Sequence, residues 1–143
     1  MSEHGRLLGI DVGSKRVGIA RTDLMRMVAA PVGTFSPSNS YKEISKQINH
    51  EGPILGIVVG WPLTPQGAPT TATPLVKEFI KKLKTDFPQV PVHKMDERFS
   101  SKEASQIMID AGVPKKKRFK KGRLDQAAAA HILQQFLEAR PEI

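Results

Sequence analysis

Short apolar runs separated by turns characterise the first part of the chain. Arg6–Val12 (RLLGIDV) is an apolar run that ends at Gly13, as is typical of a buried strand. The apolar pattern resumes at Val17–Ala20 after a turn, so the two runs predict a β-hairpin. Met25–Phe35 supplies a third strand, in which Pro31 must lie at an edge or a bulge because proline donates no ladder hydrogen bond. We therefore expect this part of the chain to form an antiparallel meander.

Helical and strand patterns alternate in the middle of the chain. Ser40–Glu43 (SYKE) is a capping box, which predicts that the first helix begins there. Ile54–Gly60 (ILGIVVG) is apolar on both faces, as in a central strand covered by helices on both sides. Thr73-Pro74 predicts a second helix with threonine as its cap and proline at its first position. Val90–Met95 then predicts a further strand.

Two more helices follow. Ser100–Glu103 is a second capping box, and Gly112 and Pro114 end the helix that it opens. The final helix is marked by the buried positions Ala128, Ala129, Ile132, Leu133, Phe136 and Leu137. Strands that alternate with helices require parallel pairing. The prediction is an α/β fold in one domain over residues 1–143, with a mixed five-stranded sheet flanked by helices on both faces.

Composition narrows the class of protein. Hydrophobic residues make up 39% and charged residues 25%, as in an ordinary globular protein. The absence of cysteine excludes a disulfide scaffold, a thiolate zinc site and a cysteine nucleophile. No apolar run approaches the ~18 residues of a membrane span, and the N-terminus has no apolar signal core. We therefore expect a cytoplasmic protein with no membrane partner.

The positive charge is concentrated in one segment. The formal net charge is +8, and Pro114–Arg123 (PKKKRFKKGR) carries seven cations and no acid, so the rest of the chain is nearly neutral. A localised patch of this kind indicates a polyanionic partner such as nucleic acid, although a solvated loop without a partner is the alternative. The cations expected to contact a phosphate backbone are Lys15, Arg16, Lys115, Lys116, Lys117, Arg118, Lys120, Lys121 and Arg123.

Three carboxylates are notable for their positions. Asp11 ends the first strand and Glu97 follows the last one, and ligands gather at the carboxyl ends of strands in open α/β sheets. Asp125 precedes the buried stripe of the final helix at helical spacing, so it shares the inward face. Mg²⁺ and Mn²⁺ prefer carboxylate oxygens, and phosphoryl transfer uses such ions. Carboxylates beside a basic patch are what a metal-dependent nuclease requires.

Each carboxylate also has a structural interpretation. Asp11 could be a turn residue, Asp125 could be a charge favoured by the helix dipole, and Asp96 or Glu97 could pair with Arg98. Geometry adds a constraint, because a last strand two places from the first lies about 9.6 Å away at the usual strand spacing. Glu97 must span that gap to share ions with Asp11, so the site is expected to assemble when metal and substrate bind.

Four motifs in order carry a family resemblance that covers nearly the whole chain. They are GIDVGSKRVGIA (Gly9–Ala20), VVGWPL (Val58–Leu63), VPVHKMDERFSSKEA (Val90–Ala104) and DQAAAAHILQQFL (Asp125–Leu137). The chain resembles the YqgF-type proteins, described as Holliday junction resolvases and as pre-16S rRNA nucleases. The resemblance implies a ribonuclease-H-like fold, a metal site at Asp11, Glu97 and Asp125, and Arg98 as a further nucleic-acid contact. It also implies a role in maturing the 5′ end of 16S rRNA in the cytoplasm.

Three positions differ from the pattern of that family. Trp61 stands where a leucine is usual, and either packing under the proline-rich loop or stacking on a base would explain it. Ala72 replaces an arginine, which puts one nucleic-acid contact in doubt, and Gly122 replaces a branched apolar residue.

Two function classes remain after this comparison. The first is an endonuclease that uses Mg²⁺ or Mn²⁺ on structured RNA such as pre-rRNA, or on branched DNA, and acts as a monomer or weak homodimer. The second is a non-catalytic nucleic-acid-binding or transcription-associated protein on the same fold. A sugar kinase or ATPase of related fold is excluded by length, because a second lobe is missing.

Overall fold

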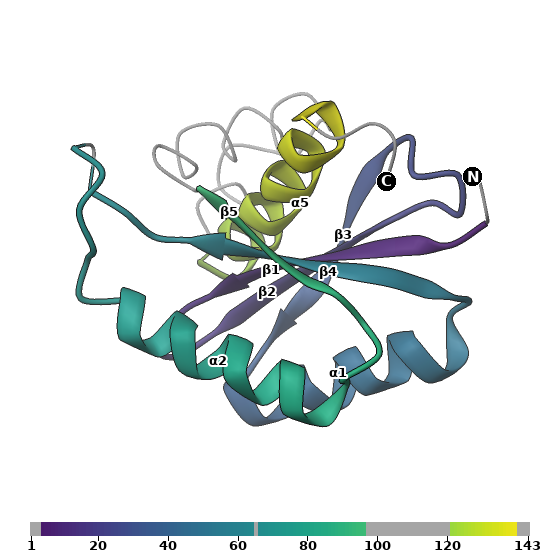
Figure 1. Ribbon diagram of the computed structural model, residues 1–143, viewed down its shortest axis with the longest axis horizontal. Helices are drawn as coiled ribbons and strands as arrows, with labels where there is room; N and C mark the ends of the chain where they lie inside the picture. Colours follow the sequence, from purple (N-terminus) through teal and green to yellow (C-terminus); the bar gives the residue numbers. More distant parts are fainter. Residues whose placement is uncertain (1–3, 65, 97–120, 140–143) are drawn as a thin grey trace.

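One mixed sheet organises the chain (Figure 1). The computed structural model describes residues 4–64, 66–96 and 121–139, with side chains in the last range from residue 126 onward. The strands are β1 (Arg6–Val12), β2 (Val17–Thr22), β3 (Ala29–Phe35), β4 (Ile54–Trp61) and β5 (Val92–Asp96). The helices are α1 (Pro37–His50), α2 (Thr73–Asp86) and α5 (Lys121–Ala139). No helix formed by the described residues is long and apolar enough to cross a membrane.

The strand order β3-β2-β1-β4-β5 confirms the predicted fold class. β1, β2 and β3 pair antiparallel as a meander, whereas β1, β4 and β5 pair parallel. The carboxyl ends of these three parallel strands therefore meet at one edge of the sheet, and β5 lies two places from β1, as the distance argument assumed.

Helices cover the two faces of the sheet unequally. Of the helices that the structure describes, α1 and α2 lie on one face and α5 lies on the other (Figure 1). Side chains alternate between the faces, so Ile10 and Val59 pack with Phe79 of α2, while Leu7 and Val58 pack with α5. β4 is buried along most of its length, which confirms that it is a central strand.

Close packing of α5 depends on a glycine in β1. A Cβ atom at Gly9 would lie 2.8 Å from the backbone oxygen of Ala129 and 2.9 Å from Cβ of Leu133. Such distances are too short for a side chain, so α5 approaches the backbone of β1 more closely than any other residue type at this position would permit.

The predicted start of the first helix is wrong by about one turn. α1 begins at Pro37, and Ser36 is its cap, because the backbone N–H of Asn39 donates to Ser36 Oγ at 3.3 Å. Ser40, expected as the cap, is fully buried inside the helix and donates from Oγ to the Pro37 carbonyl at 2.6 Å. The Ser36-Pro37 pair provides a cap and a preorganised first position one turn earlier.

The cap of α2 is also displaced by one residue. Ala72 is the N-cap and makes no side-chain cap bond, so Thr73 is the first helical residue. The buried Thr73 hydroxyl instead donates to the Pro62 carbonyl at 3.0 Å and accepts the backbone N–H of Thr70 at 2.9 Å. This residue therefore fastens the proline-rich loop to the start of α2.

The third strand is the predicted edge strand but starts four residues later than expected. Asp23 Oδ1 accepts the backbone N–H groups of Met27 and Val28 at 2.8 and 2.9 Å, which shapes a turn in the segment expected to be extended. Pro31 pairs with Ala20 at a register shift on this edge strand, as predicted for a proline in a sheet.

Several predictions lie outside the described residues. These are the helix predicted from Ser100–Glu103, its end at Gly112 and Pro114, and most of the basic segment. α5 begins at Lys121, so the last residues of that segment, Lys121 to Arg123, are helical and not part of a loop before the helix.

Candidate active site

Asp11 lies on the α5 face of the sheet at the carboxyl end of β1. Its neighbours Ile10 and Val12 face the core under α1 and α2, whereas Leu7 and Gly9 face α5. Alternation along the strand therefore directs Asp11 to the α5 side, where it is half-buried. This is the edge at which α/β sheets bind their ligands.

Glycines flank Asp11 on both neighbouring strands. Gly18 of β2 is its register partner. On β4, Ile10 pairs with Val59, so Gly60 is the next residue along and lies level with Asp11. Ala20 and Val58, two residues from these glycines, pack against α5, so Gly18 and Gly60 belong to the same face. No side chain of β2 or β4 therefore lies beside Asp11 on this face, and both flanking glycines are buried.

Because Gly60 has no side chain, it also affects how close groups on β1 and β5 can come to each other across β4. Gly60 pairs with Met95 of β5, and Met95 packs against the α5 cluster. No β4 side chain therefore separates Asp11 from the end of β5 on this face. The pairing register of the strands is what brings both glycines beside Asp11.

Side-chain hydrogen bonds fix the level of α5 over the sheet. Thr34 pairs with Gly18, the partner of Asp11, and its Oγ1 lies 3.3 Å from Gln126 Oε1. At the other end of β3, the Ala29 N–H donates to Gln134 Oε1 at 3.3 Å. α5 therefore runs antiparallel to β1, with its N-terminal turns at the level of Asp11. Those turns include the backbone of Asp125.

The hairpin turn places two predicted phosphate contacts near Asp11. The Gly13 N–H donates to the Arg16 carbonyl at 2.9 Å and closes the turn between β1 and β2. Lys15 is exposed at its tip and Arg16 is half-buried. A Cβ at Gly13 would lie 2.8 Å from the Arg16 carbonyl oxygen, so glycine is required for this tight turn.

The other predicted ligands are located less completely. Glu97 and Arg98 lie outside the described residues, and Asp125 belongs to the part of α5 whose side chains are not described. Among the side chains that are described, no three His, Asp or Glu residues are grouped as a metal site would require. The three-carboxylate site therefore stays a prediction, of which Asp11 is the described member. The remaining basic-segment cations Lys115, Lys116, Lys117, Arg118 and Lys120 also lie outside the description.

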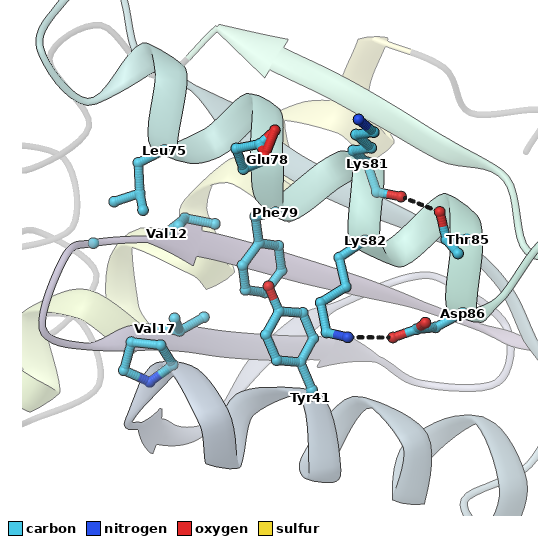
Figure 2. Close-up of a pocket in the computed structure, with 12 residues that line it drawn as sticks. Val12, Val17, Tyr41, Leu75, Glu78, Phe79, Lys81, Lys82, Thr85 and Asp86 are labelled. Carbon is cyan, nitrogen blue, oxygen red and sulfur yellow. Dashed lines mark hydrogen bonds and ion pairs between the residues drawn. The ribbon is translucent and has the colours of Figure 1, made fainter.

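A cavity of about 450 Å³ lies on the opposite face, between α1 and α2 (Figure 2). The rings of Tyr41 and Phe79 stack there with centroids 4.8 Å apart, and Lys82 Nζ lies 3.0 Å from Asp86. Burial raises the pKa of Tyr41. Val12 lines this cavity while Asp11 faces away, so the cavity does not belong to the candidate active site.

The sheet order, the acid at the end of β1 and the helix across that edge define a class of fold. The chain is similar to a solved structure of T. thermophilus RuvC in complex with a Holliday junction, with a TM-score of 0.54, 16% identity and 97% of each chain covered. It is also similar to the fowlpox virus Holliday junction resolvase, with a TM-score of 0.50 and 14% identity, over 94% of this chain and 99% of that one. The protein is thus an α/β protein of the ribonuclease-H-like fold.

Sequence comparison identifies the family. A family model described as "RuvX: Holliday junction resolvase" matches residues 5–139. A protein of Chlorobium phaeobacteroides named "Putative pre-16S rRNA nuclease" is 44% identical over 93% of this chain and 92% of its own length. A protein of the same name from Salinibacter ruber is 42% identical over 96% and 95%. The chain belongs to the RuvX family, a family of nucleases that hydrolyse phosphodiester bonds.

Proposed function

We propose that the protein is a divalent-metal-dependent endonuclease that processes the 5′ end of pre-16S rRNA in the cytoplasm, with branched DNA as a second substrate. The names of its relatives support the substrate classes. The observation that carries the assignment of the site is the position of Asp11. This acid lies between two glycines and level with the N-terminal turns of α5, at the edge where strand ends meet.

The described surroundings of Asp11 fit a hard divalent cation. The row of α5 positions 125, 129 and 133 has helical i, i+4, i+8 spacing, and both Ala129 and Leu133 lie against Gly9 of β1. Asp11 is two residues beyond Gly9, and Asp125 is one turn before Ala129, both toward the same edge. Glu97 directly follows β5, whose Met95 is level with Asp11. Asp11, Glu97 and Asp125 would therefore supply carboxylate oxygens, which suit Mg²⁺ or Mn²⁺.

Bound there, the ion would supply stabilisation of negative charge on the oxygens of the scissile phosphate. The chain contributes orientation and charge. Gly18 and Gly60 are buried, and they place no side chain of β2 or β4 beside Asp11. Lys15 and Arg16 lie on the adjacent turn and would neutralise the flanking phosphates.

A cleavage assay with Asp11→Asn tests this function. The substrates are labelled pre-rRNA leader and a branched DNA, each with Mg²⁺, Mn²⁺ or chelator. Asp86→Asn is the matched control, because it makes the same chemical change on the opposite face of the sheet. We expect Asp11→Asn to fold but not to cleave, and Asp86→Asn to cleave as the wild type does. Equal cleavage by both variants would contradict the assignment. Binding without cleavage by the wild type would favour the non-catalytic alternative.

A further inference from the structure

α2 and β5 together form a second cationic surface that the basic segment does not include. Lys77, Lys81 and Lys84 lie at i, i+4 and i+7 on the exposed side of α2, and Lys94 lies on β5. These four lysines line a groove of about 400 Å³ together with Trp61, Ile80 and Thr85. We call this feature the lysine groove.

The lysine groove contains no neutralising charge. None of its lining residues is acidic. Within the described part of the chain, none of its four ammonium groups pairs with a carboxylate, whereas Lys82 on the same helix pairs with Asp86 at 3.0 Å. Like charges around one groove repel each other in the free protein, and a polyanion relieves that repulsion while releasing its own counterions.

Trp61 gives the lysine groove a fixed element. Lys94 Nζ lies 4.2 Å from the centroid of the indole ring, a distance at which the ring attracts the cation. The ring itself is half-buried and packs against the core cluster that includes α2, so it is a packed side chain and not a free stacking platform. Trp61 therefore holds the Lys94 ammonium at the groove.

The position of the lysine groove relates it to the candidate active site. Trp61 follows Gly60, which is level with Asp11, and it pairs with Asp96 at the end of β5. The groove thus reaches the same edge of the sheet as Asp11 but from the opposite face. The lysine groove and Asp11 are therefore neighbours at the carboxyl ends of the parallel strands.

We propose that the lysine groove binds the phosphodiester backbone of a single-stranded RNA segment that flanks the cleaved bond. A positively charged groove that follows the backbone is typical of proteins that bind single strands. The proposal rests on the proposed function for its choice of RNA. It adds a contact surface formed by α2 and β5, independent of Lys15, Arg16 and the basic segment.

Salt-dependent binding of a labelled single-stranded RNA tests the proposal, with chelator present so that no cleavage occurs. The test variant is Lys77→Gln/Lys84→Gln, and the matched control is Lys42→Gln/Lys46→Gln on the exposed side of α1. Loss of two phosphate contacts lowers the slope of log affinity against log salt by about 1.4 for a single strand. The test variant should bind about 25-fold more weakly at 0.1 M salt and equally near 1 M, since that slope change spans one decade of salt. The control should keep the wild-type slope.

The intrinsic fluorescence of Trp61 reports on the lysine groove directly, because it is the only tryptophan. RNA should change the emission of the wild type and of the α1 control. It should not change the emission of Lys77→Gln/Lys84→Gln at a salt concentration at which RNA no longer occupies the groove of that variant. Equal salt slopes for the two double variants, or an emission that RNA does not change, would overturn the proposal.

The experiments distinguish an error in the lysine-groove proposal from an error in the nuclease assignment. Cleavage by Asp11→Asn would remove the catalytic assignment and leave the salt slopes as evidence for the groove. Conversely, an unchanged slope in Lys77→Gln/Lys84→Gln, with cleavage lost only in Asp11→Asn, would remove the groove and leave the nuclease.

Discussion

The two faces of the sheet differ in what their side chains provide. Under α1 and α2 the sheet carries large aliphatic side chains that pack with the stacked rings of Tyr41 and Phe79 (Figure 2). Under α5, near the carboxyl ends of the strands, it carries Gly9, Gly18 and Gly60 around Asp11. Both faces bury apolar clusters, but only the second has three buried glycines around a half-buried carboxylate. Stability and chemistry are therefore expected to respond to different substitutions.

The largest effect on stability should come from the α1/α2 face. Phe79 is 4% exposed and lies in the core cluster, so Phe79→Ala leaves a cavity there. We expect a loss of about 3–5 kcal/mol in the free energy of unfolding. Urea denaturation measures it, and cleavage by the fraction that stays folded should match the wild type. A loss of cleavage without a loss of stability would show that the α1/α2 face also contributes to the chemistry.

Gly60→Ala should affect activity more than stability. The backbone at Gly60 has no positive φ, so alanine is permitted there, but its methyl group would stand between Asp11 and β5. Displacement of the reacting groups by about 1 Å can cost on the order of 100-fold in rate. Gly56→Ala is the control, on the same strand and face but at the other end of the sheet. Equal cleavage by the two variants would contradict a role for the missing side chain at Gly60.

Thr34→Val tests whether β3 holds the N-terminal turns of α5 at the level of Asp11. This change removes the hydroxyl that lies 3.3 Å from Gln126 Oε1 and keeps a similar shape. The expected loss is about 1 kcal/mol, as for one hydrogen bond. Hydrogen exchange should speed up in the first turns of α5 and stay unchanged in α1. Uniform exchange across both helices would show that this bond does not position α5.

The smallest effect concerns the turn before β3. The backbone N–H of Val28, followed by those of Met27 and Met25, donates to Asp23 and holds the pKa of its carboxyl below the usual value. A lowered folded pKa means that the stabilisation is present above about pH 4, the unfolded value, and is lost as the pH falls through the folded pKa. Asp23→Asn should flatten this dependence, and thermal melts between about pH 2 and pH 5 measure it.

Sequence periodicity was sufficient for the elements whose pattern is local. The hairpin, the doubly buried strand β4 and the inward stripe of α5 follow from short-range alternation or helical spacing. The predicted starts of α1 and α2 were wrong because, for each helix, the sequence offers two possible start signals that lie one turn or one residue apart. Ser36-Pro37 competed with Ser40, and the Thr73 hydroxyl bonded to the distant Pro62 carbonyl instead of capping.

The remaining features depend on pairing between distant strands, which periodicity does not encode. Gly18 and Gly60 flank Asp11 only because of the register of β2 and β4 with β1. Lys94 meets Trp61 only because β4 and β5 pair in parallel. Asp11 could be proposed from sequence because a carboxylate at a strand end is a local signal, whereas its surroundings depend on strand pairing.

Metal-induced stabilisation tests the central claim most directly, namely that the glycine-flanked face at Asp11 binds a divalent cation. Thermal melts with and without Mn²⁺ compare the wild type with Asp11→Asn, Asp125→Asn and the control Asp86→Asn. At about 100 times the dissociation constant, binding adds about 2.7 kcal/mol and raises Tm by on the order of 8 °C. We predict this increase for the wild type and Asp86→Asn, and its loss in Asp11→Asn and Asp125→Asn. An undiminished increase in Asp11→Asn would contradict the account.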